Sequence, residues 1–180
     1  GGGPDGKNLL QFTYGMSLLY SPFFLMAHAL TTHMEIPWVG YQADGYTVPY
    51  RIALIISGFA YLLLGLYFLR KTLLRYYSEV VTAVTLLSVT LGSNVFYYAT
   101  TEVTMSHVYS FSLIAVFIYY TIKWSEETNL KHTLVLGLLT GIISLIRPNN
   151  AIIIFFLVFY GVTNWKSFYN RILFLLRSYK

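Results

Sequence analysis

The chain has 180 residues, of which 56% are hydrophobic, 18% aromatic and only 11% charged, and its formal net charge is +5. A water-soluble domain carries about 25% charged residues, so this composition excludes an ordinary soluble enzyme and predicts an integral membrane protein. The sequence contains no cysteine, which excludes disulfides, iron–sulfur clusters and thiolate metal sites. Lysine and arginine stand in short connections between apolar runs, so membrane topology explains the positive charge better than nucleic-acid binding does.

In chain order, residues 1–13 are expected to form a polar segment on the outer face. Residues 14–49 are expected to form an interfacial or re-entrant helix followed by an outer loop. The apolar part of this helix, residues 18–30, is interrupted by Ser21-Pro22 and by His28. A run this short is more typical of an interfacial segment than of a spanning one.

Residues 50–164 are predicted to form a transmembrane bundle of about five helices, since about 20 apolar residues cross a hydrocarbon core. The predicted spans are 52–69, 80–99, 105–122, 132–146 and 151–162. Residues 165–180 are expected to be either a basic amphipathic tail in the membrane plane or the start of a further span. The predicted fold class is therefore an all-α, polytopic bundle with an N-terminal interfacial or re-entrant helix.

Basic residues in alternate connections predict the orientation of these spans. The basic connections carry Arg70, Lys71 and Arg75, then Lys123 and Lys131, then Lys166 and Arg171. Basic loops stay on the cytoplasmic side. The connections at residues 100–104 and 148–150 hold no Lys or Arg, although Arg147 borders the second, and are therefore predicted on the outer face.

Arg147 is the strongest candidate for a binding residue. Pro148 follows it, removes a backbone donor and disfavours a helical Arg147, and both flanking helices are short. A helix broken at this depth is expected to line a polar cavity, where Arg147 with Asn149 and Asn150 would suit a phosphate. The alternative is an arginine reaching the headgroups beside ordinary Asn turn residues.

Glu102 and His107 lie in the other outer loop, within residues 97–110, with His107 near the start of the span that follows. They are candidates to assist catalysis, by proton transfer or by orienting a sugar hydroxyl. The alternative is a solvated loop carboxylate and a histidine at a helix start. No metal-binding motif is present. Asn94 predicts a hydrogen bond between helices, and the spacing of Gly137 and Gly141 predicts close helix packing.

The order of these features resembles the C-fold glycosyltransferase superfamily, the polyprenyl-phosphate-sugar-dependent membrane enzymes related to protein mannosyltransferases and aminoarabinose transferases. The stretch YGMSLLYSPFFL resembles the in-plane helix of that superfamily's first outer loop, and Tyr50-Arg51-Ile52 with Arg70-Lys71 resembles its next span. Residues 96–100 and 105–111 are similar to Bacteroidetes-type members. Residues 137–141 and 145–149 resemble the end of their fifth helix.

The resemblance implies transfer of a sugar from a polyprenyl-phosphate carrier to a glycan, lipid or protein acceptor on the outer, periplasmic face of the bacterial inner membrane. The expected partners are membrane lipids, this donor and the acceptor, with no nucleic acid and no further cofactor. The family's catalytic acid lies upstream of the part resembled here, and the surroundings of Asp5 do not match it, so the catalytic residue is unassigned. The chain is accordingly expected to be a piece of a longer enzyme and inactive by itself. The alternatives are a transporter or flippase for a lipid-linked or anionic solute and a non-catalytic membrane assembly subunit.

Overall fold

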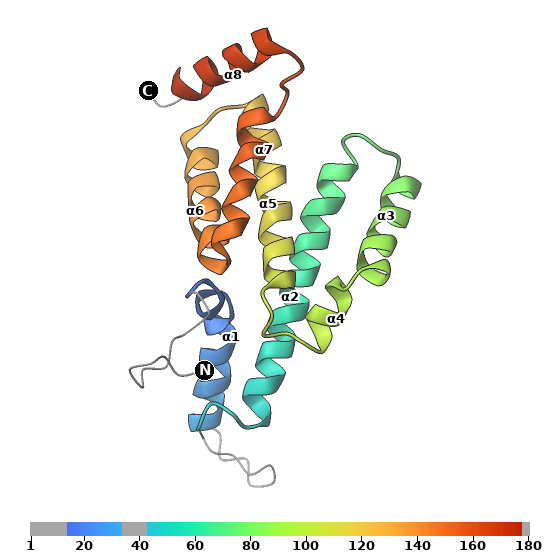
Figure 1. The fold of residues 1–180 in the computed structure, drawn as a ribbon. Coiled ribbons are helices and arrows are strands. Elements are labelled where there is room, and N and C mark those ends of the chain that lie inside the picture. The colour runs from blue at the N-terminus through green and yellow to red at the C-terminus, as the bar shows by residue number, and fades with distance from the viewer. Residues whose placement is uncertain (1–13, 34–42, 178–180) are drawn as a thin grey trace, which may run out of the picture.

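A computed structural model describes residues 14–33 and 43–177, and every regular element in these ranges is a helix (Figure 1). The elements are α1 (Gly15–His33), α2 (Val48–Leu73), α3 (Glu79–Gly92), α4 (Val95–Thr100), α5 (His107–Glu126), α6 (Leu130–Ile146), the 3-10 helix η1 (Pro148–Ile153), α7 (Ile154–Phe159) and α8 (Trp165–Arg177). The all-α fold class is confirmed for the described residues. The expectation for residues 1–13, and that for residues 34–42 of the outer loop, lie outside them.

Helix α2 is the longest element and connects the two halves of the molecule. Its N-terminal part runs beside α1, and its C-terminal part runs beside α5 (Figure 1). At a rise of 1.5 Å per residue, its 26 residues extend over about 39 Å. Within the described ranges, α2 alone is long and apolar enough to cross a bilayer by itself, whereas α3, α6 and the η1–α7 segment are apolar but shorter.

The second predicted span, residues 80–99, is two helices rather than one. Helix α3 ends at Gly92, Ser93 has an extended backbone, and α4 begins at Val95. Ser93 Oγ accepts a hydrogen bond from the Val95 N–H. Glycine, serine and asparagine are poor residues for a helix interior, because they are flexible or bond the nearby backbone. Asn94 is the residue that precedes α4, so its predicted position within a continuous span is wrong.

Helix α1 continues through Pro22, where the sequence predicted an interruption. A proline has no N–H to donate to the carbonyl four residues earlier, which here is that of Leu18. The Ser21 hydroxyl donates to this carbonyl instead, at 2.9 Å. The Ser21-Pro22 pair therefore preserves the hydrogen bonding of the helix.

The hydrophobic core lies where α1, α2, α5 and α6 meet. Tyr109 and Phe117 of α5 and Ile143 of α6 are fully buried within it. Nε1 of Trp124 donates to Thr133 Oγ1 at 2.8 Å, which joins the end of α5 to the start of α6. This core fixes the ends of α5 and α6, the two helices that carry His107 and Arg147.

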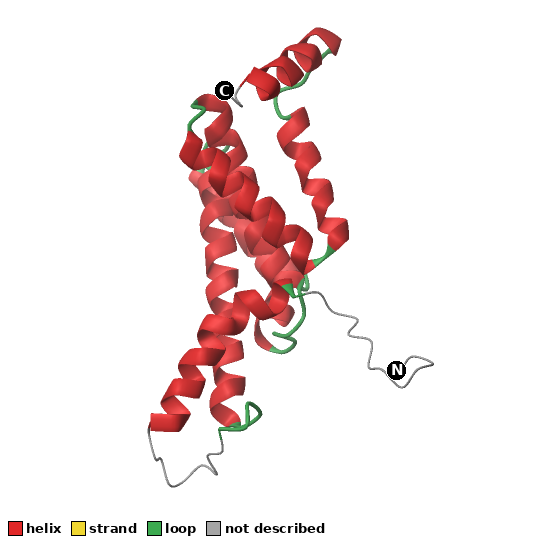
Figure 2. Cartoon of the chain, turned by 90° about the vertical axis from the view of Figure 1, so that its left-hand side faces the viewer, coloured by secondary structure: helices red, strands yellow, loops and turns green. Residues whose placement is uncertain are grey.

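Helix α8 turns away from the axis of α7 and lies across one end of the molecule (Figures 1 and 2). The turn contains Gly161 with φ of +80°, a conformation that glycine adopts without steric cost. With 13 residues, α8 is shorter than the roughly 20 residues that a spanning helix needs.

Candidate functional site at the break after α6

Arg147 separates α6 from η1. Its backbone is extended, with φ of −149° and ψ of 123°, as expected for a residue that precedes proline. The Arg147 N–H donates to the carbonyl of Ile143 at 3.3 Å, and the Arg147 carbonyl accepts from the Asn150 N–H at 2.9 Å. Hydrogen bonds on both sides thus define the break, and the Arg147 side chain is exposed.

Asn150 connects this break to α5. Its amide Nδ2 donates to Ser110 Oγ at 2.9 Å in a partly buried position. Asn149 is exposed, whereas Asn150 is half-buried. The two asparagines therefore differ, because Asn150 positions the backbone while Asn149 faces outward.

His107 lies at the start of α5, one turn before Ser110. Its ring stacks on that of Tyr98 from α4, with centroids 4.2 Å apart and planes inclined by 26°. Arg147 is within electrostatic range of this ring. The structure therefore places Arg147, Asn150 and His107 in one part of the molecule, and adds two residues that the sequence reasoning missed, Tyr98 and Ser110. The spacing of His107 and Ser110, three residues apart in one helix, would have placed them on the same face.

Glu102 is not joined to this group. It is half-buried in the turn between α4 and α5, where its carbonyl accepts from the Met105 N–H at 2.9 Å. In the described part of the chain, no hydrogen bond or ion pair links its carboxylate to His107 or Arg147. The acid–imidazole pair suggested by the sequence is therefore not assembled in this conformation.

The site lies along the side of α2 rather than at its end. A Cβ placed on Gly58 of α2 would lie 2.7 Å from the Ala99 carbonyl oxygen of α4, so the two backbones meet there. Gly58 is about 15 Å along the helix from Val48. Helix α1 and the first half of α2 extend beyond this level (Figure 1). The break after α6 therefore lies level with the middle of α2 and not with its end.

The chemistry available at this site comes from a guanidinium, an amide, a hydroxyl and an imidazole. Across residues 14–33 and 43–177, no three His, Asp or Glu side chains are grouped so that they would hold a metal ion. An arginine with a neighbouring amide and hydroxyl is suited to an oxyanion such as a phosphate.

No protein-family model matches this chain, and neither a curated protein nor a solved structure matches it significantly.

Proposed function

We propose that this chain is part of an integral membrane glycosyltransferase that binds a polyprenyl-phosphate-linked sugar, with Arg147 holding the donor phosphate. The observation that carries the proposal is the exposed Arg147 guanidinium at a helix break level with the middle of α2, next to the Asn150–Ser110 bond. A donor with a long apolar chain and a charged phosphate needs an apolar surface for the chain and a cation for the phosphate, and both are available here.

The surface of the helices supports a bilayer location. Large apolar side chains point outward from several helices, among them Leu63, Leu87 and Leu138, each more than 60% exposed. Apolar surface of this extent is typical of a membrane contact. We propose a multi-pass protein of the bacterial inner membrane, with α2, α3, α5, α6 and the η1–α7 segment in the bilayer and Arg147 towards the outer face.

In the proposed reaction, an acceptor hydroxyl or amine attacks the anomeric carbon of the donor sugar. The bond from that carbon to the phosphate oxygen breaks, and its electron pair leaves with the polyprenyl phosphate. Arg147 would stabilise the negative charge on this leaving group. A base must take the acceptor proton; we assign Glu102 and His107 only assisting roles, because neither has, among the residues that the structure describes, the partner that would identify it as that base.

Binding of polyprenyl phosphate to the purified chain in detergent, measured by native mass spectrometry, tests the phosphate assignment. Arg147→Ala is expected to weaken binding about tenfold or more, since a hydrogen bond to a charged group contributes about 1.5–3 kcal/mol. Arg147→Lys should be intermediate, because lysine keeps the charge but not the planar fork.

Arg51→Ala is the matched control. Arg51 is exposed near the start of α2, so its removal changes the net charge equally but leaves the break intact. Binding should persist in this variant. An equal loss in both variants, or none in Arg147→Ala, would contradict the proposed role of Arg147.

Transport of a lipid-linked or anionic solute is the second candidate, and the discontinuous α6–η1 segment favours it, because transporters build substrate sites from broken helices. An assay in proteoliposomes that contain the full-length protein and a labelled lipid-linked sugar distinguishes the two functions. Sugar transfer to an added acceptor supports the transferase. Movement of the intact lipid between leaflets without transfer supports the flippase.

A further inference from the structure

Arg171 of α8 is a half-buried cation at the end of the molecule remote from Arg147. Its Nη2 donates to the Leu157 carbonyl at 2.8 Å and to Ser125 Oγ at 3.0 Å. Its guanidinium lies 5.3 Å from the ring centroid of Phe174 and 5.6 Å from that of Trp124. Burial lowers the pKa of Arg171, yet an arginine remains charged in proteins.

This guanidinium has no carboxylate partner in the part of the chain that the structure describes. Its Nε is buried there and forms no hydrogen bond. A cation withdrawn from water is unfavourable unless an anion or a full set of hydrogen bonds compensates it. The two bonds from Nη2 compensate it only in part, so an anion is the expected complement.

A cavity of about 370 Å³ lies directly beside Arg171. Its polar lining comes from Ser125, Tyr160, Ser167, Asn170 and Arg171 itself. The hydroxyls of Ser125 and Ser167 already donate to the carbonyls of Thr121 and Asn164, so the guanidinium and the Asn170 amide are the main donors to a phosphate oxygen here. The size of the cavity is suitable for a headgroup.

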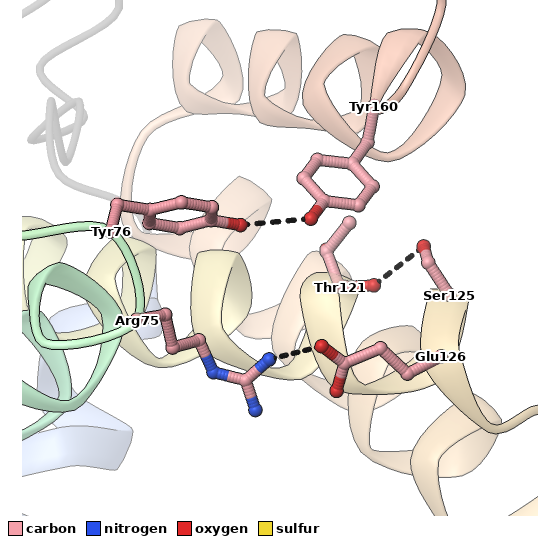
Figure 3. Close-up of polar contacts among 6 residues, drawn as sticks. All are labelled: Arg75, Tyr76, Thr121, Ser125, Glu126 and Tyr160. Atoms are coloured by element: carbon pink, nitrogen blue, oxygen red, sulfur yellow. Dashed lines mark hydrogen bonds and ion pairs between the residues drawn. The ribbon is translucent and has the colours of Figure 1, made fainter.

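Figure 3 shows two side-chain pairs close to Tyr160 and Ser125, two of the residues that line this cavity. Tyr76 from the connection after α2 and Tyr160 join through their hydroxyls at 3.0 Å, and Arg75 forms an ion pair with Glu126. The negative charge of the Glu126 carboxylate is therefore balanced by Arg75. Burial and the Tyr76 bond raise the pKa of Tyr160 to about 12, so Tyr160 stays a neutral hydroxyl at physiological pH.

A separate apolar cavity of about 670 Å³ lies at the start of α8 and is lined in part by Phe159, Val162, Trp165 and Phe168. Trp165 is 86% exposed, as expected of an aromatic anchor at a membrane interface. An interfacial aromatic anchor on the helix that also carries Arg171 favours the phosphate of a membrane lipid over a free phosphate ion.

We propose that the cavity beside Arg171 binds the phosphate of an anionic membrane phospholipid, whose acyl chains enter the bilayer beside α8. Basic pockets between helices at the membrane surface recognise such headgroups. The site is independent of the donor site proposed at Arg147, since the η1–α7 segment separates the two. Bound lipid would hold α8 in the membrane plane.

Native mass spectrometry of the full chain in detergent, with phosphatidylglycerol or phosphatidylcholine added, tests this assignment. The wild type is expected to retain phosphatidylglycerol over phosphatidylcholine. Arg171→Gln should reduce phosphatidylglycerol retention about tenfold, the change expected for one bond to a charged group. The control Lys166→Gln removes the same charge from an exposed position of the same helix and should retain the lipid.

Arg171→Gln also removes the hydrogen bond to the Leu157 carbonyl. A second variant, at Asn170, therefore keeps Arg171 and this bond. Asn170→Asp places a negative charge at the cavity and should reduce phosphatidylglycerol retention more than Asn170→Ala, which only removes the amide, while both leave the melting temperature unchanged. Equal losses in Arg171→Gln and Lys166→Gln, undiminished binding in Asn170→Asp, or equal retention of both lipids would overturn the proposal. Displacement of phosphatidylglycerol by inorganic phosphate would instead identify a soluble phosphate as the ligand and overturn the lipid assignment.

Discussion

Gly15, the first residue of α1, lies against the peptide unit between Leu145 and Ile146 at the end of α6. A Cβ placed on Gly15 would overlap the backbone atoms of both residues. The next residue along the chain is Arg147, so the start of α1 and the candidate phosphate-binding arginine share one packing contact. Gly15 therefore couples the position of α1 to the break after α6.

Substitution of Gly15 by alanine is expected to separate α1 from α6. Overpacking in a well-packed region costs about 1–3 kcal/mol, and here the opposing atoms are backbone, which cannot rotate away. The free energy of unfolding, measured from thermal or denaturant melts in detergent, should fall by this amount. Polyprenyl phosphate binding should also weaken, because Arg147 would move with the end of α6.

Gly141→Ala is the matched control for this substitution. Gly141 lies in α6, and an added Cβ there meets no atom of residues 14–33 or 43–177 within 4 Å. Since alanine is a better helix former than glycine by up to about 1 kcal/mol, Gly141→Ala should be neutral or stabilising. A loss of stability equal to that of Gly15→Ala would mean that the close approach at Gly15 has no special cost.

A second close approach joins α2 to α4 at Gly58. A Cβ at this position would lie 2.7 Å from the Ala99 carbonyl oxygen and 3.0 Å from a methyl carbon of Val103. Gly58→Ala is expected to displace α4, and with it the Tyr98 ring that stacks on His107. Unfolding melts should show a loss of about 1–3 kcal/mol, whereas Gly137→Ala, with no atom within 4 Å of its Cβ, should lose nothing.

These glycines show how far the sequence predicts the helix packing. The small-residue spacing of Gly137 and Gly141 predicted a close contact, but a Cβ at either position meets open space, and the close contacts fall at Gly15, Gly58 and Gly65. Spacing alone reveals which face of a helix has small residues. It does not reveal whether another helix passes that face, because this depends on where the chain returns after its turns.

A buried hydrogen bond between α2 and α5 gives a third prediction. Ser57 Oγ and Tyr109 Oη are 3.1 Å apart, and both side chains are fully buried. Tyr109→Phe leaves the Ser57 hydroxyl without this partner, which is expected to cost about 1–3 kcal/mol of unfolding free energy. Adding Ser57→Ala removes the orphaned group, so the double variant should recover part of the loss.

Tyr97→Phe provides the control, because Tyr97 is 49% exposed and water can bond its hydroxyl in the wild type. This change should leave the melting curve within about 0.5 kcal/mol of the original. If Tyr109→Phe changes the free energy of unfolding as little as Tyr97→Phe does, the Ser57–Tyr109 bond contributes nothing to the packing of α2 on α5.

The candidate site was partly predictable for a specific chemical reason. Proline after Arg147 dictates an extended residue and hence a helix break, so this part follows from two adjacent residues. The Asn150–Ser110 bond and the Tyr98–His107 stack join residues far apart in sequence or on different helices, and only the packed fold brings them together. For the same reason, the short distance in sequence between Glu102 and His107 did not predict whether their side chains would meet, and they form no contact in the structure described.

The ion pair between Arg75 and Glu126 gives the fourth prediction, because it joins the end of α2 to the end of α5 across 51 residues of sequence. Its arginine side chain is 26% exposed, whereas the Arg70–Glu79 pair is open, with 53% and 86% exposure and a separation of 4.0 Å. Exposed pairs contribute about 0–1 kcal/mol. A double-mutant cycle of Arg75→Ala and Glu126→Ala should therefore give a coupling energy near the upper end of this range, and the same cycle for Arg70 and Glu79 one near zero. Raising the salt concentration should reduce the Arg75–Glu126 coupling, since ions screen exposed charges and the Glu126 side chain is 58% exposed. Equal coupling in both cycles would show that the contact between the ends of α2 and α5 depends on apolar packing alone.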